Sequence, residues 1–145
     1  MQVALGKRAD YGIRAVLELS RHHNHGRRKS REIAAATAVP PAYLARILAT
    51  LSQADLVAAT AGPAGGYELI RGPTEVTMLE VIEVMEGEFA VRQCMLRGIP
   101  CASGSTCSVH DFWTAAQSAL NQELEQTTFA DILDREATIA APSAD

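Results

Sequence analysis

Three cysteines and a histidine lie close together in the second half of the chain. Cys94, Cys101 and Cys107 fall within fourteen residues, and His110 follows three residues after the last of them. Three thiolates and an imidazole are ligands that suit zinc or an iron–sulfur cluster. The cysteines are too widely spaced for the close Cys-x2-Cys pairs of zinc ribbons, so the pattern favours a cluster wrapped by an irregular loop.

Other uses of these four residues stay open at this point. The odd number of cysteines argues against a disulfide framework, and the chain start carries charges that no signal peptide would tolerate. The thiols could act without metal as a redox switch, could hold a structural zinc ion, or could belong to a small electron-transfer iron–sulfur protein. The sequence contains no phosphate-binding loop, Ser-His-Asp arrangement or carboxylate pair that would indicate an enzyme.

A second group of residues carries positive charge. The chain has a formal net charge of −4, but residues 1–71 hold ten Lys and Arg against five Asp and Glu, whereas residues 72–145 are strongly acidic. An acidic protein with a basic half is expected when only that half meets a polyanion. The tightest cluster is predicted to contact nucleic-acid phosphates and consists of Arg27, Arg28, Lys29 and Arg31.

The elements that would position this basic half follow from hydrophobic spacing and turn residues. Helices are predicted over residues 10–22, 31–37 (with Ser30 as N-cap) and 41–54, followed by strands over 56–60 and 67–70 around a Gly-rich tip. Two helices separated by a short turn and followed by a hairpin are the order of a winged helix–turn–helix. The fold class is therefore predicted as mainly α with a small β-hairpin.

The third predicted helix has two different faces. Leu44, Ile47, Leu48 and Leu51 form a stripe that must face a core, and small residues occupy the opposite side. A smooth face of this kind can enter a major groove, where an arginine can offer paired donors to guanine. The predicted DNA contacts are Ala42, Tyr43 and Arg46 from this helix and Gly62, Gly65 and Gly66 from the hairpin tip.

The second half is predicted to begin with a helix capped by Thr77 and Glu80 and to continue through an irregular cysteine loop. A long helix follows over residues 108–126, a further helical turn or two starts at Thr128, and residues 138–145 form a flexible tail. The apolar side of the long helix comprises Phe112, Trp113, Ala116, Leu120 and Leu124.

Length and composition favour one domain in this arrangement. The chain has 145 residues, of which 48% are hydrophobic and 21% charged, enough for a core without disulfide support. We divide it into a winged helix–turn–helix region (1–75), a cluster loop with a dimerisation helix (76–137) and the tail (138–145). No apolar stretch is long enough to span a membrane, so we expect a cytoplasmic protein without a membrane partner.

These motifs resemble the Rrf-type family of bacterial winged-helix transcription regulators. The residues that carry the resemblance are Lys7–Val16, Pro41–Leu48, Leu56-Val57, Gly62–Tyr67 and the cysteine loop. The family includes the iron–sulfur cluster regulator, the nitric-oxide-sensitive repressor and the rhizobial iron regulator. One departure is Ala61, at a position before the Gly-Pro of the wing where members often carry arginine.

The resemblance implies a homodimer that binds a palindromic operator in double-stranded DNA and pairs through the apolar side of the long helix. An iron–sulfur cluster near the dimer interface would control operator affinity in response to redox state, nitric oxide or iron. Members differ in the fourth cluster ligand. A histidine matching His110 accompanies [2Fe–2S], and an aspartate matching Asp10 of the partner subunit accompanies [4Fe–4S]. The Cys-x2-His match favours His110 and [2Fe–2S].

Overall fold

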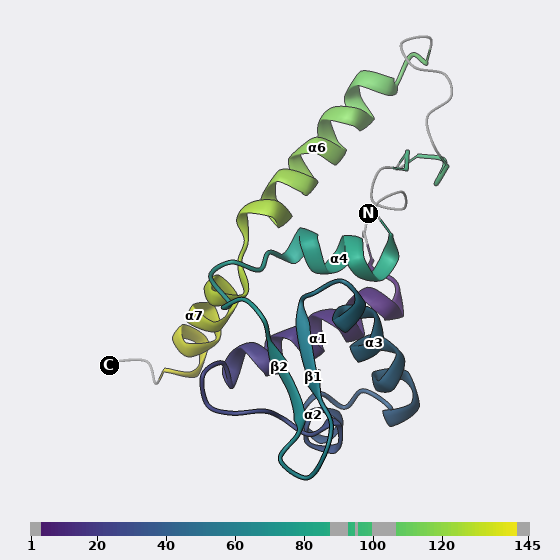
Figure 1. Ribbon diagram of the computed structural model, residues 1–145. Helices are drawn as coiled ribbons and strands as arrows, with labels where there is room; N and C mark the ends of the chain where they lie inside the picture. Colours follow the sequence, from purple (N-terminus) through teal and green to yellow (C-terminus); the bar gives the residue numbers. More distant parts are fainter. Residues whose placement is uncertain (1–3, 88–92, 95, 100–106, 142–145) are drawn as a thin grey trace.

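A computed structural model describes residues 4–87, 93–94, 96–99 and 107–141. Figure 1 shows helices and a hairpin gathered in one body from which a long helix projects. The mainly helical fold with a small hairpin is as predicted. In chain order the elements are α1 (Lys7–Arg21), α2 (Ser30–Thr37), α3 (Pro41–Gln53), β1 (Val57–Thr60), β2 (Gly66–Leu69), α4 (Met78–Glu86), α6 (His110–Gln126) and α7 (Phe129–Ala140).

Helix α1 runs through the centre of the core. Ala15, Val16 and Leu19 are buried, as their spacing predicted. Gly12 lets α4 come close, because a Cβ there would lie 2.5 Å from the Cγ of Met85. The helix begins three residues earlier than predicted, since the backbone N–H of Ala9 donates to Oε1 of Glu86 on α4 (3.1 Å). A side chain distant in sequence thus supplies what a local cap would.

Helices α2 and α3 form the helix–turn–helix. Their axes bend by 113° at a turn that contains Ala38 in a left-handed conformation (φ 57°) and Pro40. Pro41 occupies the first position of α3, as expected from its missing N–H. The prediction of Ser30 as N-cap was wrong by one residue. The N-cap is Lys29, whose backbone N–H donates to the Glu32 carboxylate (2.9 Å), so Ser30 already lies inside the helix.

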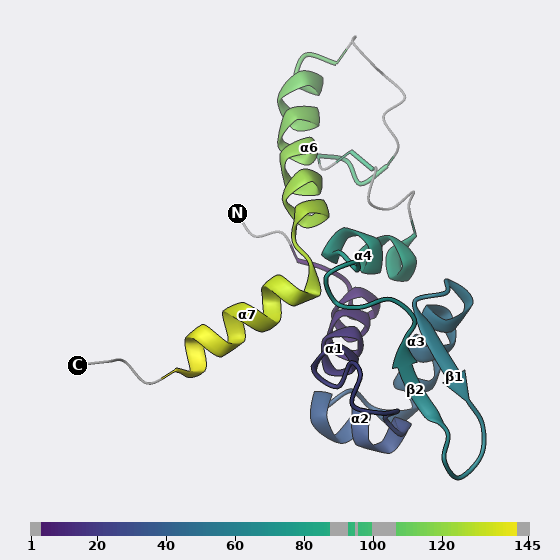
Figure 2. The same cartoon turned by 60° about the vertical axis from the view of Figure 1, so that its left-hand side comes forward.

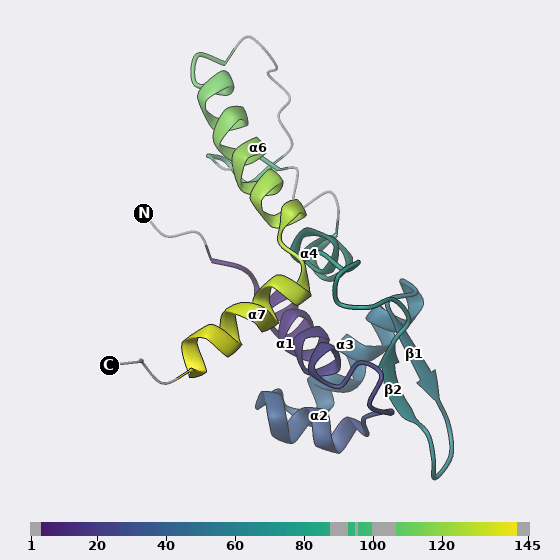
Figure 3. The same cartoon turned by 90° about the vertical axis from the view of Figure 1, so that its left-hand side faces the viewer.

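The wing is the antiparallel hairpin of β1 and β2. Val57 pairs with Leu69 and Thr60 with Gly66, within a residue of the predicted strands. The link before α2 extends this sheet, because Arg28 and Tyr67 exchange two backbone hydrogen bonds (2.9 and 2.8 Å). In all three whole-molecule views the wing loop lies at the end of the molecule opposite to the far end of α6 (Figures 2 and 3).

Helix α7 is longer than predicted. It extends to Ala140, so the first three residues of the predicted tail are helical, and residues 142–145 lie outside the described ranges. The Thr128 hydroxyl accepts from the Asp131 N–H (3.1 Å), and the Asp131 carboxylate accepts from the Thr128 N–H (2.9 Å). Tertiary contacts stabilise the helix further, because Phe129 is buried and Arg21 of α1 pairs with Glu136 (2.5 Å).

Among the described residues, no single helix is long and apolar enough to cross a membrane. Helices α2 and α3 reach that length only as a sharply bent pair, and the leucines of α3 lie in the protein core.

Candidate nucleic-acid interface and cysteine loop

Helix α3 separates a buried face from an exposed one. Leu44, Ile47, Leu48 and Leu51 are buried in the core, as predicted. The opposite side is exposed and carries only small residues, one tyrosine and one arginine, namely Ala42, Tyr43, Ala45, Arg46 and Ala49. This face is small enough for close approach to a major groove and carries a guanidinium group that can donate to a base.

Residues of α1 support the exposed start of α3. The ring of Tyr43 lies 5.9 Å from the ring of Tyr11, tilted by 58°. The guanidinium of Arg14 lies 6.0 Å from the same Tyr11 ring, and its Nη1 donates to the carbonyl of Thr37 at the end of α2 (3.4 Å). The sequence analysis missed Tyr11 and Arg14, because only the packing of α1 against α3 brings them to this surface.

The four predicted phosphate contacts of the basic cluster differ in their surroundings. Nε of Arg27 lies 3.3 Å from a carboxylate oxygen of Glu68 on β2. Arg28 pairs with Glu18 (3.3 Å) and with Glu32 (3.5 Å), and the Glu18 side chain is only 5% exposed. Both arginines are therefore largely neutralised by acidic side chains, and Arg28 joins the link to α1 and to the start of α2.

Neither Lys29 nor Arg31 forms an ion pair with an acidic side chain among the described residues. Nζ of Lys29 donates to the carbonyls of Pro63 (2.6 Å) and Gly62 (3.4 Å) in the wing loop. Arg31 on α2 and Arg46 on α3 are exposed, and neither has an ion-pair partner among the described residues. The hydrogen bond from the Lys29 N–H lowers the pKa of Glu32 most, and the positive charges of the nearby arginines and lysine lower it further.

The glycines of the wing have a folding reason of their own. Gly62 and Gly66 adopt positive φ angles of 94° and 143°, which few side chains tolerate. A Cβ on Gly65 would collide with the carbonyl of Thr60, and one on Gly66 would lie 2.7 Å from the carbonyl of Arg28. These glycines are thus required for the hairpin and for its contact with the link, whatever else they touch.

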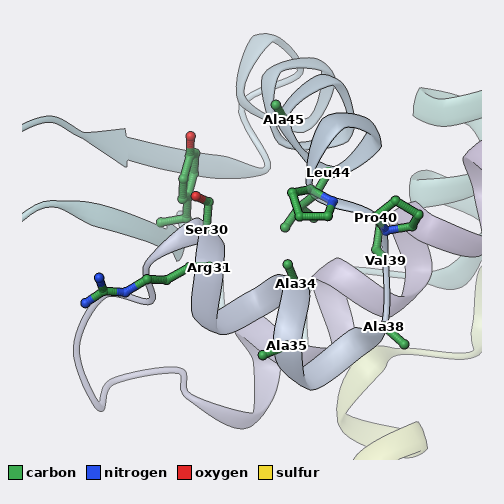
Figure 4. Close-up of a pocket in the computed structure, with 11 residues that line it drawn as sticks. Ser30, Arg31, Ala34, Ala35, Ala38, Val39, Pro40, Leu44 and Ala45 are labelled. Carbon is green, nitrogen blue, oxygen red and sulfur yellow. The ribbon is translucent and has the colours of Figure 1, made fainter.

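The surface between α2, the start of α3 and the wing is hollowed (Figure 4). This pocket has a volume of about 570 Å³ and is lined mainly by small apolar side chains, with Ser30, Arg31 and Tyr67 toward the wing. In the figure the Arg31 guanidinium points away from the alanines, toward solvent. The turn of the helix–turn–helix, the start of α3 and Tyr67 of the wing therefore border one hollow, which Ala45 of the exposed face of α3 also lines.

The structure describes part of the cysteine loop. Cys94 and Cys107 are half-buried free thiols, and Cys101 lies outside the described residues. The carbonyl of Cys94 accepts from the N–H groups of Arg97 (3.2 Å) and Gly98 (2.7 Å), which closes a tight turn. Cys107 precedes α6, where its carbonyl accepts from the His110 N–H (3.0 Å). The loop and α6 are tied together, because Gln117 Nε2 donates to the carbonyl of Gln93 (2.6 Å).

The chemistry of this donor set fits an iron–sulfur cluster, but the ligand set is incomplete in the described part of the chain. Within those residues no three Cys, His, Asp or Glu side chains are gathered closely enough to hold a metal ion. Cys107 and His110 lie at the start of α6, where the helix dipole favours thiolates. Asp10, the alternative ligand, pairs with Arg14 on its own helix (3.0 Å), and both side chains are about half exposed.

Helix α6 carries an uncovered apolar side. None of its side chains is fully buried, although the helix lies wholly within the described ranges. Leu124 packs against the core and Trp113 is half-buried, whereas Phe112 is 77% and Leu120 38% exposed. Exposed apolar side chains on a projecting helix indicate an interaction surface.

Sequence comparisons place this geometry among regulators. A family profile described as "Rrf2: Iron-dependent Transcriptional regulator" matches residues 5–135. A protein of Mycobacterium tuberculosis strain H37Rv, whose name describes it as an HTH-type transcriptional regulator, is 35% identical over 129 residues, covering 88% of this chain and 80% of the relative. The protein rrf2 of Nitratidesulfovibrio vulgaris is 25% identical over 140 residues, covering 97% and 93%. These relatives are regulators and not enzymes, as the sequence analysis predicted.

Solved structures share the fold. IscR of T. potens superposes with a TM-score of 0.80 at 24% identity, covering 99% of this chain and 96% of its own. CymR of B. subtilis, described as the global cysteine regulator, superposes with a TM-score of 0.77 at 24% identity, covering 92% and 98%.

Proposed function

Because the chain belongs to the Rrf2 family of transcriptional regulators, we propose that it binds operator DNA with an affinity set by an iron–sulfur cluster in its second half. The DNA-binding part of the proposal rests on the exposed face of α3, which carries small residues and Arg46 and lies beside the wing and Arg31. Neither arginine has an ion-pair partner among the described residues. Transcription regulation is the function of the family, and the cluster and its signal are our proposal.

Helix α3 would lie in the major groove. Arg46 presents donors that match O6 and N7 of guanine, and Tyr43, held by Tyr11, reaches a phosphate or a thymine methyl group. The alanines beside them permit close approach. The wing loop, with Gly62, Gly65 and Gly66, would follow the adjacent backbone or minor groove through its N–H groups.

Two chains would pair through α6. The exposed Phe112 and Leu120, with Trp113, Ala116 and Leu124, supply an apolar surface that a second copy can cover. A two-fold dimer presents two copies of α3, so its operator would be a palindrome with half-sites a helical turn or more apart.

Cys94, Cys101, Cys107 and His110 would hold the cluster, with Asp10 of the partner subunit as the alternative fourth ligand. Such a cluster, when bound, supplies an iron centre sensitive to redox state and nitric oxide. The chain's own contribution is mechanical. Gln117 ties the residue before Cys94 to α6, and His110 bonds the backbone of Cys107, so restraint of the loop restrains the dimer helix.

A cluster-free thiol regulator is the second candidate. Cys94 and Cys107 are free and half-exposed, as a thiol switch requires, and one structural neighbour is described as a cysteine regulator. A zinc-containing regulator would use the same residues.

The deciding experiment is an absorption spectrum of anaerobically purified protein, with iron and sulfide assayed on the same sample and DNA binding measured alongside. We expect a brown protein with near-equal iron and sulfide that loses or changes DNA affinity in a Cys101→Ala variant. Two irons per chain favour [2Fe–2S] and His110, whereas four favour [4Fe–4S] and Asp10. A protein that stays colourless after reconstitution contradicts the cluster and favours the thiol or zinc regulator.

A further inference from the structure

The wing loop and the start of α2 enclose a second hollow beside the one in Figure 4. We propose that it seats one phosphate group of the DNA backbone, with Lys29 and Arg31 as the binding cations. This inference rests on the proposed DNA binding and assigns one contact within it to a defined site.

The lining of this hollow suits an anion. Its volume is about 430 Å³, and it is bordered by Lys29 and Arg31, by the hydroxyl-bearing residues Ser30 and Thr60, and by the backbone of the wing loop. Within the described chain none of the lining residues is acidic. A phosphate oxygen binds most strongly to charged donors, which hydroxyl donors can supplement, and both kinds are found here.

Among the described residues no acidic side chain forms an ion pair with the Lys29 ammonium group. This group donates to the carbonyls of Pro63 and Gly62, which fix its position but do not neutralise it. One of its three N–H donors stays available to a ligand. Arg27 and Arg28 differ in this respect, because Glu68, Glu18 and Glu32 offset their charges.

The wing itself brings no cation. Residues 57–70 contain neither lysine nor arginine, and Ala61 stands before the Gly-Pro of the loop. Lys29 therefore supplies positive charge to the wing loop from a position 34 residues earlier in the chain.

The hollow exists before DNA binds. The two backbone hydrogen bonds between Arg28 and Tyr67 hold the link against the wing sheet, and the absence of a Cβ at Gly66 permits this approach. Because Lys29 adjoins this fixed pair, little conformational freedom has to be lost when a phosphate enters.

The test uses the full-length protein and a duplex that the wild-type protein selects from a random-sequence library. A single neutral methylphosphonate is moved along each strand, and dissociation constants are measured for wild type, Lys29→Met, Lys29→Arg and Arg46→Met. We expect one phosphate position in each half-site at which neutralisation weakens wild-type binding about tenfold, the loss of one charge-assisted contact. The Lys29→Met protein should bind unmodified DNA more weakly by a similar factor. A methylphosphonate at that position, and at no other, should then leave its binding unchanged.

The controls separate this site from other contacts. Lys29→Arg keeps the charge and should keep the sensitivity, and Arg46→Met should bind more weakly yet retain it. If Lys29→Met melts at a lower temperature, Arg31→Met provides the same comparison without the wing contact. The inference is overturned if Lys29→Met and Arg31→Met both remain sensitive to methylphosphonate at every position where the wild type is sensitive. It is also overturned if inorganic phosphate binds in a Lys29-dependent way but no methylphosphonate position weakens DNA binding. Failure of the wild type to bind any duplex would instead contradict the proposed function.

Discussion

The salt dependence of DNA binding shows how many basic side chains contact phosphates. It therefore distinguishes cations without an acidic partner in the structure from those that acidic side chains already pair. Each neutralised phosphate contributes about −0.9 to the slope of log K against log salt concentration. The structure leaves Lys29, Arg31 and Arg46 without acidic partners among the described residues. Because Lys29 and Arg31 share one phosphate and Arg46 contacts a base, two bound chains would then neutralise two phosphates, which gives a slope of about −1.8.

Counting Arg27 and Arg28 as further phosphate contacts, as the sequence suggests, gives six phosphates and a slope of about −5.4. Between 50 and 200 mM salt the first slope corresponds to an affinity loss of about tenfold, and the second to one on the order of 10³-fold. Fluorescence anisotropy on a selected duplex across this range separates them easily.

Variants sharpen the comparison. A variant with both Lys29→Met and Arg31→Ala should lower the magnitude of the slope by about 1.8, one phosphate for each of two chains. Arg28→Ala should leave the slope unchanged and lower the free energy of unfolding by about 1–2 kcal/mol. The buried Glu18 loses one partner but keeps Arg21, and Arg28 is itself a quarter exposed. A wild-type slope near about −5.4, or an Arg28→Ala slope reduced as much as that of the double variant, would refute the reasoning.

Three further outcomes are expected. Gly12→Val should lower the free energy of unfolding by about 1–3 kcal/mol in denaturant titrations, because its side chain would overlap Met85, and unchanged stability would contradict the close packing of α1 on α4. Phe112→Glu should shift sedimentation from dimer to monomer with little change in melting temperature, since Phe112 is 77% exposed, and a persistent dimer would exclude this face of α6. Hydrogen bonds from Thr128 lower the pKa of Asp131, so its stabilisation is present above the ordinary pKa of aspartate and is lost as pH falls through the lowered value. Asp131→Asn should therefore weaken hydrogen-exchange protection of α7 at neutral pH but not in strong acid, and an equal deficit at both would contradict the carboxylate's role.

Local patterns predicted most of the first half correctly. The stripe of Leu44, Ile47, Leu48 and Leu51 required a core on one side of α3, and Pro41 marked its first residue. The Thr77 cap likewise marked the start of α4, where its hydroxyl accepts from the Glu80 N–H (3.2 Å). Periodicity and capping involve residues within one or two turns of each other, so a sequence contains them directly.

The errors at the ends of α1 and α7 come from contacts between distant residues. Helix α1 starts early because Glu86 accepts from its first turn, and α7 continues through Thr138 while Arg21 holds Glu136. The position of Tyr43 against Tyr11 depends likewise on the packing of two helices.

The sequence alone determined that this chain has a helix–turn–helix, a Gly-rich wing, a basic first half and a cysteine loop, because each is a local property of residue type and spacing. Only the tertiary structure decided which positively charged side chains are available to a phosphate. Arg27 and Arg28 face acidic side chains, whereas Lys29 faces carbonyls of the wing, although these three adjacent cations of one link look alike in sequence. Charge pairing depends on distances of a few ångströms between segments that folding alone brings together.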